Sequence, residues 1–315
     1  MERATLSWDH CRSLLGVYRT GSLSAAARAL GVTQPTVARH VEQLEQALGG
    51  ASLFTRSPQG LAPTEAAETL IPHALTMEAS AAAMLRAASG PADALAGVVR
   101  ITASEVIGIE VLPPILADLA ATHPQIAFEL VASNETADLL RRDADIAVRM
   151  VRPSQTALIA RKIGDIPLGF FAHEDYLARR GTPVTLRDLS GHALIGFDHE
   201  TTSVQALRAR GLDLRRDMFA FRTDSDVAQL SAIRSGLGIG ICQIALARRD
   251  PRLVRLFPEK MTFPLETWVT MHGDLRGNRR MRLVFDHLAR ALTAYVKTGK
   301  DGSTKNAPAA RQGRF

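Results

Sequence analysis

Cysteine is scarce in this sequence, whose 315 residues contain only Cys11 and Cys242. Two thiols so far apart provide neither a metal-ligand spacing nor a disulfide framework, and they fit a reducing compartment. The first ten residues, MERATLSWDH, lack the apolar core of a secretion signal. The uncharged apolar stretch 235–247 is too short to cross a bilayer. These absences predict a soluble cytoplasmic protein without a membrane partner.

Motifs of the common enzyme classes are also missing. The glycine run 236–240 (GLGIG) lacks the G-x-G-x-x-G spacing of a dinucleotide site, and it ends at a predicted strand instead of opening a helix. The nine histidines form no ligand set, and neither a nucleophile elbow nor a Walker motif occurs. We therefore expect no enzymatic activity, no metal site and no cofactor.

The overall composition indicates a globular protein, and its net charge favours an acidic partner. Hydrophobic residues make up 46% and charged residues 22%, enough for a sizeable core, and the length predicts two or three domains. The net charge is +6, which favours a partner such as nucleic acid. Part of this excess lies in residues 297–315, which we expect to be a disordered basic tail.

The first sixty residues predict three short helices. Apolar residues give one face to a helix over 8–19, and Ser22 or Ser24 caps a second helix over 25–30. Gly31 suits the position after a helix end, and Thr33 and Pro35 suit the start of a third helix. Apolar residues recur in this third helix at steps of four and three, at Val37, Val41, Leu44 and Leu48. Its opposite face is polar and carries Gln34, Thr36, Arg39, His40 and Gln43, an arrangement typical of a helix-turn-helix.

Residues 21–70 resemble the DNA-binding signature of the LysR-type transcription regulators. The matching residues are Ser24-Ala25-Ala26, Gln34-Pro35, Leu44-Glu45, Leu53-Phe54-Thr55-Arg56, Leu61 and Thr64. Ala38 departs from the family's usual serine, which puts one phosphate contact in doubt, and Ala67 replaces its usual glycine. The resemblance implies a winged helix-turn-helix over residues 1–63.

Groove chemistry suggests how this head contacts DNA. Gln34 and Arg39 can make bidentate bonds to base edges, and Pro35 and Thr36 can touch a thymine methyl group. His40 lies on the same polar face. Phosphate contacts are expected from Ser22, Ser24 and Arg56. The alternative for Arg39 is a solvated cation on a polar face.

Residues 64–91 predict a linker helix that carries a dimer seam. Small and apolar residues recur there with heptad spacing, at Ala67, Leu70, Ala74, Met77, Ala81, Met84 and Ala88. Pro72 predicts a bend. We interpret Leu70, Ala74, Met77, Ala81 and Met84 as dimerisation residues, because the small N-terminal domain offers the stripe no other apolar partner. The alternative is packing on the protein's own core.

Residues 92–296 predict an α/β domain. Strands are expected at 97–103, 126–132 and 145–149, with helices from Ser104 to 121 and over 136–141. A second set of strands is expected at 167–172, 193–197, 218–222 and 237–241. A strand at 267–271 and an amphipathic helix then return to the first set. This plan resembles the two-lobed, periplasmic-binding-protein-like effector domain of LysR-type regulators, with lobe 1 over 92–165 and 267–296 and lobe 2 over 166–266.

Ligands of such sheets bind beyond the carboxyl ends of the strands. The residues expected there are Ser104, Ser133, Asn134, Arg149, Phe197 and Ser225, with Ser104 favoured by its family position. The alternatives are that Ser104 and Ser225 only cap helices and that Arg149 holds the hinge through an ion pair. Asp198 and Asp226 either pair with Arg149 or face a ligand that carries a donor.

Together these features predict a promoter-binding regulator whose DNA binding responds to a small-molecule effector. The resemblance implies self-association as a homodimer or homotetramer, and RNA polymerase as a further candidate partner. The alternative is a DNA-binding protein whose small-molecule-binding-like domain has no sensing role.

Overall fold

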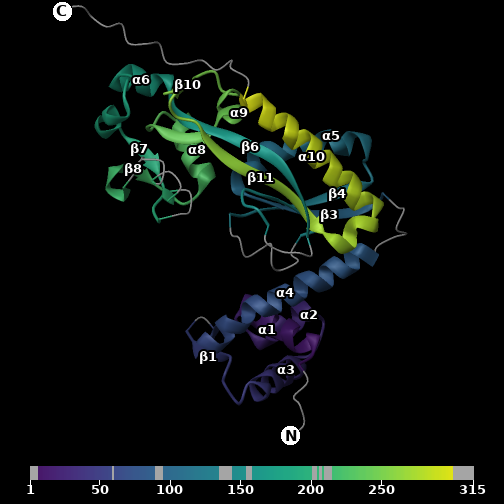
Figure 1. Cartoon of the computed structure of the whole chain (residues 1–315). Helices are drawn as coiled ribbons and strands as arrows, with labels where there is room; N and C mark the ends of the chain where they lie inside the picture. The colour runs from purple at the N-terminus through teal and green to yellow at the C-terminus, as the bar shows by residue number, and fades with distance from the viewer. Residues whose placement is uncertain are drawn as a thin grey trace, which may run out of the picture. The chain divides into compact units, whose positions relative to one another are not determined.

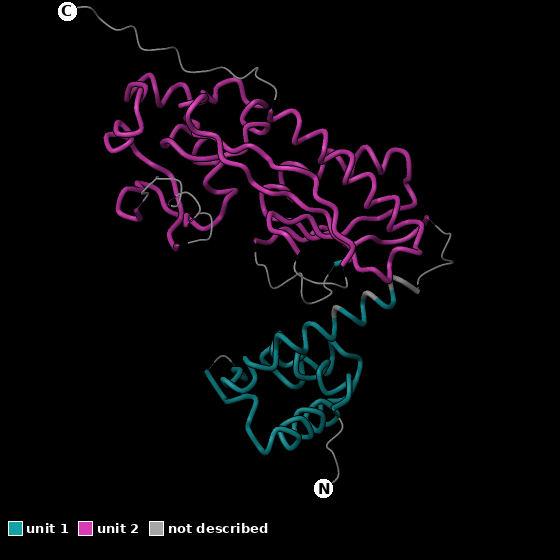
Figure 2. Tube along the Cα trace, viewed as in Figure 1, with its two compact units in different colours: residues 1–90, 136–144 teal, residues 91–135, 145–315 magenta. Residues whose placement is uncertain are grey.

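The computed structural model describes residues 6–58, 60–88, 95–134, 144–153, 158–200, 204–205, 208 and 215–300. The chain divides into two compact units (Figure 2). The described residues of unit 1 lie within 6–88, together with Ala144, and those of unit 2 lie within 95–134 and 145–300. The predicted helix at 136–141 and residues 301–315 of the predicted tail lie outside the described residues.

Unit 1 contains three helices, a hairpin and a long helix. The helices are α1 (Trp8–Thr20), α2 (Leu23–Leu30) and α3 (Gln34–Ala47). Strands β1 (Phe54–Ser57) and β2 (Gly60–Pro63) form an antiparallel hairpin, and α4 (Glu65–Ala88) follows. These elements agree with the predicted three helices, wing and linker helix.

Local chemistry explains where these helices begin and end. The Ser22 hydroxyl accepts a hydrogen bond from the Ala25 amide at 3.4 Å, so Ser22 caps α2. Gly31 ends that helix with a φ of 68°, which a residue without a Cβ adopts at little cost. Thr33 precedes α3 as predicted, but its hydroxyl contacts the Thr36 hydroxyl at 2.8 Å.

The core of unit 1 includes part of α4. Leu14 and Leu15 of α1, Leu44 of α3 and Leu53 form one buried cluster. Ala67, Ile71 and Ala74 of α4 are buried in the same cluster. The expectation that the small N-terminal domain offers the α4 stripe no apolar partner is therefore wrong for this half of the helix.

Unit 2 is built on a seven-stranded sheet (Figure 1). Strands β3 (Gly97–Ala103), β4 (Ile126–Ala132) and β5 (Ile146–Arg149) lie parallel, in the spatial order β5-β3-β4. Beside β5 run two long antiparallel strands, β11 (Phe263–His272) and β6 (Leu158–His173). Strands β9 (Gly240–Gln243) and β10 (Leu253–Leu256) both pair with β6.

Most of the remaining elements lie at the two ends of the long strands, whereas α10 (Arg279–Lys300) runs alongside these strands (Figure 1). At one end, lobe 1, are β3–β5 with α5 (Leu112–Thr122). A π-helical turn, Ile107–Val111, precedes α5. At the other end, lobe 2, are α6 (Glu174–Arg180), α8 (Asp226–Arg234), α9 (Ile244–Ala247) and the parallel pair of β7 (Leu194–Gly196) and β8 (Phe219–Arg222).

Several predicted bounds need correction. The strands predicted at 167–172 and 267–271 belong to β6 and β11, which are longer and continue from one lobe into the other. The strand predicted at 237–241 lies at 240–243. Residues 297–300, assigned to the tail, are the last turn of α10, where the buried Gly299 packs close to Pro167.

Two hydrophobic cores hold unit 2 together. The larger core draws residues from β3, β5, β6, β11, α5, α8, α9 and α10. The smaller core lies between the far end of β6, α6, β7 and β10. Within the described part of the chain, no helix is both long and apolar enough to cross a membrane.

Candidate functional site

Helix α3 turns its polar face outward. Val37, Val41 and Leu44 are buried, whereas Gln34 and Arg39 are exposed. Pro35 and Gln43 are also exposed, and Thr36 is half-buried. Leu48, predicted on the buried face, is 39% exposed because α3 ends one residue earlier. The exposed face carries side chains whose donors and acceptors can bond to base edges in a major groove, which admits an α-helix.

His40 differs from its neighbours because it turns toward α1. Its Nδ1 atom lies 2.8 Å from the hydroxyl of the buried Ser13. Burial, followed by the nearby charge of His10, lowers the pKa of His40. Between the same two helices, α1 and α3, His10 Nε2 lies 3.1 Å from Gln43 Oε1. His40 therefore helps to hold α3 against α1, and the DNA contact predicted for it stays a prediction.

The wing is fastened to the turn between α1 and α2. The Gly21 carbonyl accepts a hydrogen bond from the Leu61 amide at 2.7 Å. Gly60, with a φ of 120°, packs so closely that a Cβ there would lie 2.6 Å from the Gly21 oxygen. Arg56 on β1 and Ser24 near the start of α2 are both exposed, as phosphate contacts require, whereas Ser22 is half-buried and acts as the cap.

Side-chain contacts join the middle of helix α4 to α1. Arg19 makes a bidentate ion pair with Glu78 at 2.9 and 2.5 Å, and this bonding lowers the pKa of Glu78. The Cys11 thiol points at the Met77 sulfur at 3.7 Å. Among the residues predicted for dimerisation, Ala74 is therefore buried in its own head and Met77 partly engaged. Leu70 packs partly on the same core, Ala81 is half-buried and Met84 is 71% exposed.

In unit 2, Arg149 joins the carboxyl ends of the three parallel strands. Its side chain is buried and donates hydrogen bonds to the Thr102 hydroxyl at 2.7 Å and to the Ser133 carbonyl. Of the two alternatives for Asp198 and Asp226, pairing with Arg149 does not occur among the described residues. Asp198 pairs with Arg216 at 2.6 Å, and Asp226 accepts a hydrogen bond from Asn134.

Ser104 lies at the end of β3, beside the ends of both neighbouring strands. Its amide donates to the Val148 carbonyl of β5 at 3.4 Å. The Ser133 amide, after β4, donates to the Ala103 carbonyl at 2.9 Å. Within the described part of the chain, the Ser104 hydroxyl makes no hydrogen bond, so it is free for a ligand.

Four polar side chains join the two lobes at this point. Ser225, the cap of α8, donates its hydroxyl to Glu105 Oε2 at 2.9 Å. Asn134 donates to Asp226 Oδ2 at 2.9 Å and accepts from the Glu105 amide at 3.0 Å. The structure thus brings Ser104, Ser133, Asn134 and Ser225 to one region, with Arg149 beneath them.

Phe197 follows β7 in lobe 2. The last carbonyl of β7, that of Gly196, accepts a hydrogen bond from the Thr223 amide at 3.0 Å.

Burial raises the pKa of Asp226 to about 6. The hydrogen bond from Asn134 acts in the opposite direction, and the nearby Glu105 carboxylate raises the pKa further. Two carboxylates therefore face each other across the lobe boundary, and one of them titrates close to neutral pH.

A second link between the lobes joins the end of α8 to the π-helical turn. Arg234, at the end of α8, makes a bidentate ion pair with Glu110 in the π-helical turn, at 2.6 and 2.9 Å. This bonding lowers the pKa of Glu110. Sequence reasoning missed Glu105, Glu110 and Arg234. For Glu105 the sequence did contain a signal, its position next to Ser104 at a helix start. Glu110 and Arg234 are 124 residues apart, and no local pattern in the sequence connects residues at that separation.

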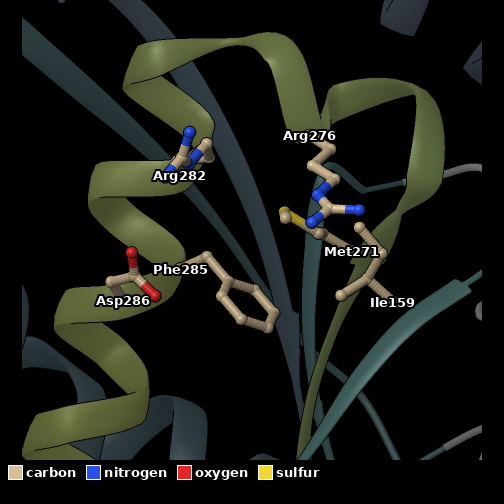
Figure 3. Close-up of a pocket in the computed structure, with 6 residues that line it drawn as sticks. All are labelled: Ile159, Met271, Arg276, Arg282, Phe285 and Asp286. Atoms are coloured by element: carbon tan, nitrogen blue, oxygen red, sulfur yellow. The ribbon is translucent and has the colours of Figure 1, made fainter.

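The hollow shown in Figure 3 lies elsewhere in lobe 1. One of its lining residues, Met271 of β11, pairs with Ile146 at the start of β5. Ser104, in contrast, follows the end of β3, where Ala103 pairs with Val148. The hollow is therefore separate from the predicted effector position. Among the described residues, no cluster of His, Cys, Asp and Glu could hold a metal ion.

Comparison with known families covers both units. Residues 8–68 match the family described as bacterial regulatory helix-turn-helix protein, lysR family. Residues 92–293, well over half of the chain, match the LysR substrate binding domain. The chain belongs to the LysR family. This LysR-type transcriptional regulator has the predicted fold: a winged helix-turn-helix, a linker helix and a two-lobed effector-binding domain.

Individual relatives support the same assignment. The regulator CrgA of Neisseria meningitidis serogroup C is 27% identical over 284 residues, which cover 88% of this chain and 94% of CrgA. The probable regulator LtrA of Klebsiella pneumoniae is 26% identical over 282 residues, covering 87% and 91%. The structure of CrgA from Neisseria meningitidis aligns with 91% of this chain and 99% of its own at a TM-score of 0.55. Full-length CbnR complexed with its target DNA, at 18% identity and a TM-score of 0.59, covers 90% and 99% and shares the fold.

Proposed function

We propose that this LysR regulator binds a promoter through α3 and the wing, and that a small molecule bound beside Ser104 changes this binding. The observation that carries the proposal is the convergence of Ser104, Ser133, Asn134 and Ser225 at the carboxyl ends of the parallel strands, where lobe 2 contacts lobe 1. Such strand ends are the usual ligand position of open α/β sheets.

The proposed mechanism is a shift between lobe arrangements. Contacts from Ser225, Asp226 and Arg234 hold α8 against lobe 1. A ligand that replaces some of these contacts with its own would favour one arrangement over another. The chemistry of the ligand follows from its neighbours: a free hydroxyl at Ser104 and hydrogen-bond acceptors at Glu105 and Asp226.

On the DNA side, Arg39 and Gln34 are the proposed base readers, with Pro35 and Thr36 beside them. Ser24 and Arg56 are the proposed phosphate contacts. We further propose that the chain acts in the cytoplasm, where promoter DNA lies, that it has no enzymatic role, and that it pairs through the exposed end of α4 into a dimer or tetramer. RNA polymerase is a proposed partner at the promoter.

The test is a metabolite screen by thermal shift on the full chain, followed by DNase footprinting on the operator. A ligand of the native state raises its melting temperature by mass action. We expect at least one stabilising compound to change the footprint, and Ser104→Trp to block this change while leaving operator affinity intact. A stabilising compound that leaves the footprint unaltered would favour the alternative, a DNA-binding protein whose second domain has no sensing role.

A further inference from the structure

The hollow in lobe 1 combines an apolar base with an excess of positive charge at its edge. Ile159 of β6 and Met271 of β11 line its sheet side, and the ring of Phe285 on α10 points toward them (Figure 3). Its volume is about 390 Å³, within the range of about 300–1,000 Å³ that is usual for small-molecule sites. The lining is therefore suited to a small apolar body.

Two arginines stand at the edge of this hollow. Arg276, in the 3-10 turn Gly273–Gly277, extends toward Met271 and Ile159, and Arg282 projects from α10 (Figure 3). Both are exposed, and within the described part of the chain neither guanidinium makes an ion pair or a hydrogen bond. Asp286 also lines the hollow, and its carboxylate lies 3.9 Å from the guanidinium of Arg161, outside the lining. The lining therefore carries two guanidinium groups against one carboxylate, an excess of positive charge.

Guanidinium groups bind carboxylates through planar paired hydrogen bonds. We propose that this hollow is a second small-molecule site, which takes a monocarboxylate with an apolar chain. The chain would lie on Ile159, Met271 and Phe285, and the carboxylate would bind Arg276 and Arg282. This site is independent of the effector position proposed beside Ser104.

The hollow lies on the two strands that connect the lobes. Ile159 and Met271 belong to β6 and β11, the two strands that continue from lobe 1 into lobe 2. Met271 and Phe285 are buried in the larger core of unit 2. An occupant therefore contacts the elements on which the relative arrangement of the lobes depends.

The test uses octanoate as the probe and the full chain as the receptor, with binding followed by saturation-transfer NMR and isothermal titration. We expect saturable octanoate binding, with the strongest transfer at the chain methylenes. Acetate lacks the apolar body and octylammonium carries the wrong charge, so both should bind at least tenfold more weakly. Arg276→Gln and Arg282→Gln should each weaken octanoate about threefold, as expected for an exposed charge contact, and the double variant should weaken it further.

Arg279→Gln is the matched control, because Arg279 is an exposed arginine of the same helix that does not line the hollow. It should leave octanoate affinity unchanged. Equal octanoate binding by the double variant and the parent would overturn the proposal. Loss of octanoate binding in Ser104→Trp, with full binding in the double variant, would also overturn it and would assign the probe to the cleft between the lobes. Loss of operator affinity in the double variant, without loss of octanoate, would overturn it and identify this edge as a DNA contact.

Discussion

At the scale of single residues, the wing rests on a glycine that no other residue can replace without strain. Gly60 has a φ of 120°, and a Cβ there would lie 2.6 Å from the Gly21 oxygen. We expect Gly60→Ala to destabilise the head by about 1–3 kcal/mol and to weaken operator binding, measured by thermal melting and fluorescence anisotropy. Gly191→Ala is the control, because Gly191 has no atom within 4 Å of a built Cβ. Equal melting temperatures for both variants would contradict this account of the wing.

Arg39 is the residue on which sequence discrimination is expected to depend. Its side chain is exposed on the outer face of α3, and loss of a bidentate base contact costs about 1–3 kcal/mol of discrimination. Arg39→Ala should therefore bring operator and mismatched DNA to similar affinity while folding is retained. Arg12→Ala on α1 should preserve the preference. Retention of the full operator preference by Arg39→Ala would show that Arg39 is not a base reader.

Asp226 makes the stability of unit 2 depend on pH. Its folded-state pKa of about 6 lies above its ordinary value of 3.8. The protonated carboxyl of Asp226 therefore makes its full contribution to the stability of the folded state below about pH 4. This contribution is lost as the pH rises to about 6. Asp226→Asn retains an acceptor for Asn134 and removes the charge. The stability of this variant relative to the parent should rise between pH 4 and 6 and then stay constant in urea titrations.

Asp188 provides a control of opposite sign. Backbone hydrogen bonds from Thr185 and Val184 lower the pKa of Asp188, so its contribution is present above its ordinary pKa and is lost as the pH falls. Asp188→Asn should therefore lose stability relative to the parent at neutral pH. A flat difference for Asp226→Asn across pH 4–6 would show that Asp226 ionises normally.

At the scale of elements, α4 shows how far a hydrophobic period can be interpreted. The period correctly predicts a helix with one apolar stripe, but it does not say what covers the stripe. Ala67 and Ala74 pack on α1 and α3 of the same chain, whereas Met84 and Leu85 are 71% and 74% exposed. The stripe is thus buried near the start of α4 and exposed near its end, and only the packing of α1 against α4 determines where burial stops.

The long strands β6 and β11 were only partly predictable for a related reason. Where these strands pass between the lobes, the exposed charged residues Arg161, Lys162 and Glu266 interrupt the apolar pattern. A register shift at Thr267 and Trp268 interrupts the alternation further. Local periodicity therefore detects one end of each long strand and misses the rest, whereas β3 and β4, which pair in regular parallel register, have the predicted bounds.

Helix α8 is attached to lobe 1 by one ion pair whose strength can be measured. The pair between Glu110 and Arg234 is bidentate and partly buried, with side-chain exposures of 21% and 32%. A double-mutant cycle of Glu110→Gln and Arg234→Gln should give a coupling of about 1 kcal/mol in the free energy of unfolding. The more exposed pair of Arg100 and Glu129 makes a single contact and should couple less. Additive single variants at Glu110 and Arg234 would show that this pair does not hold the lobes.

At the scale of the whole molecule, the two units differ in how much their sequences reveal. The head is a local structure, so caps, turns and helix faces within about sixty residues predict it and its exposed reading face. The cleft is assembled from residues far apart in the chain, such as Asn134 and Asp226, which are separated by 92 positions. Strand ends predicted the region and its serines. The carboxylates that join the lobes depend on how the lobes are packed together, which no local pattern encodes.

The exposed end of α4 leads to a prediction about assembly. Met84 and Leu85 form an apolar surface beyond the part of α4 that packs on its own head, and an apolar helix face in water is stabilised by pairing with a second copy. Met84→Glu places a charge on this surface and should shift sedimentation toward the monomer, with a loss of operator affinity because two linked heads bind more tightly than one. Ala82→Glu lies about half a turn away on the same helix, so it should leave the mass unchanged. If both variants sediment like the parent and bind the operator equally well, the molecule pairs through another surface.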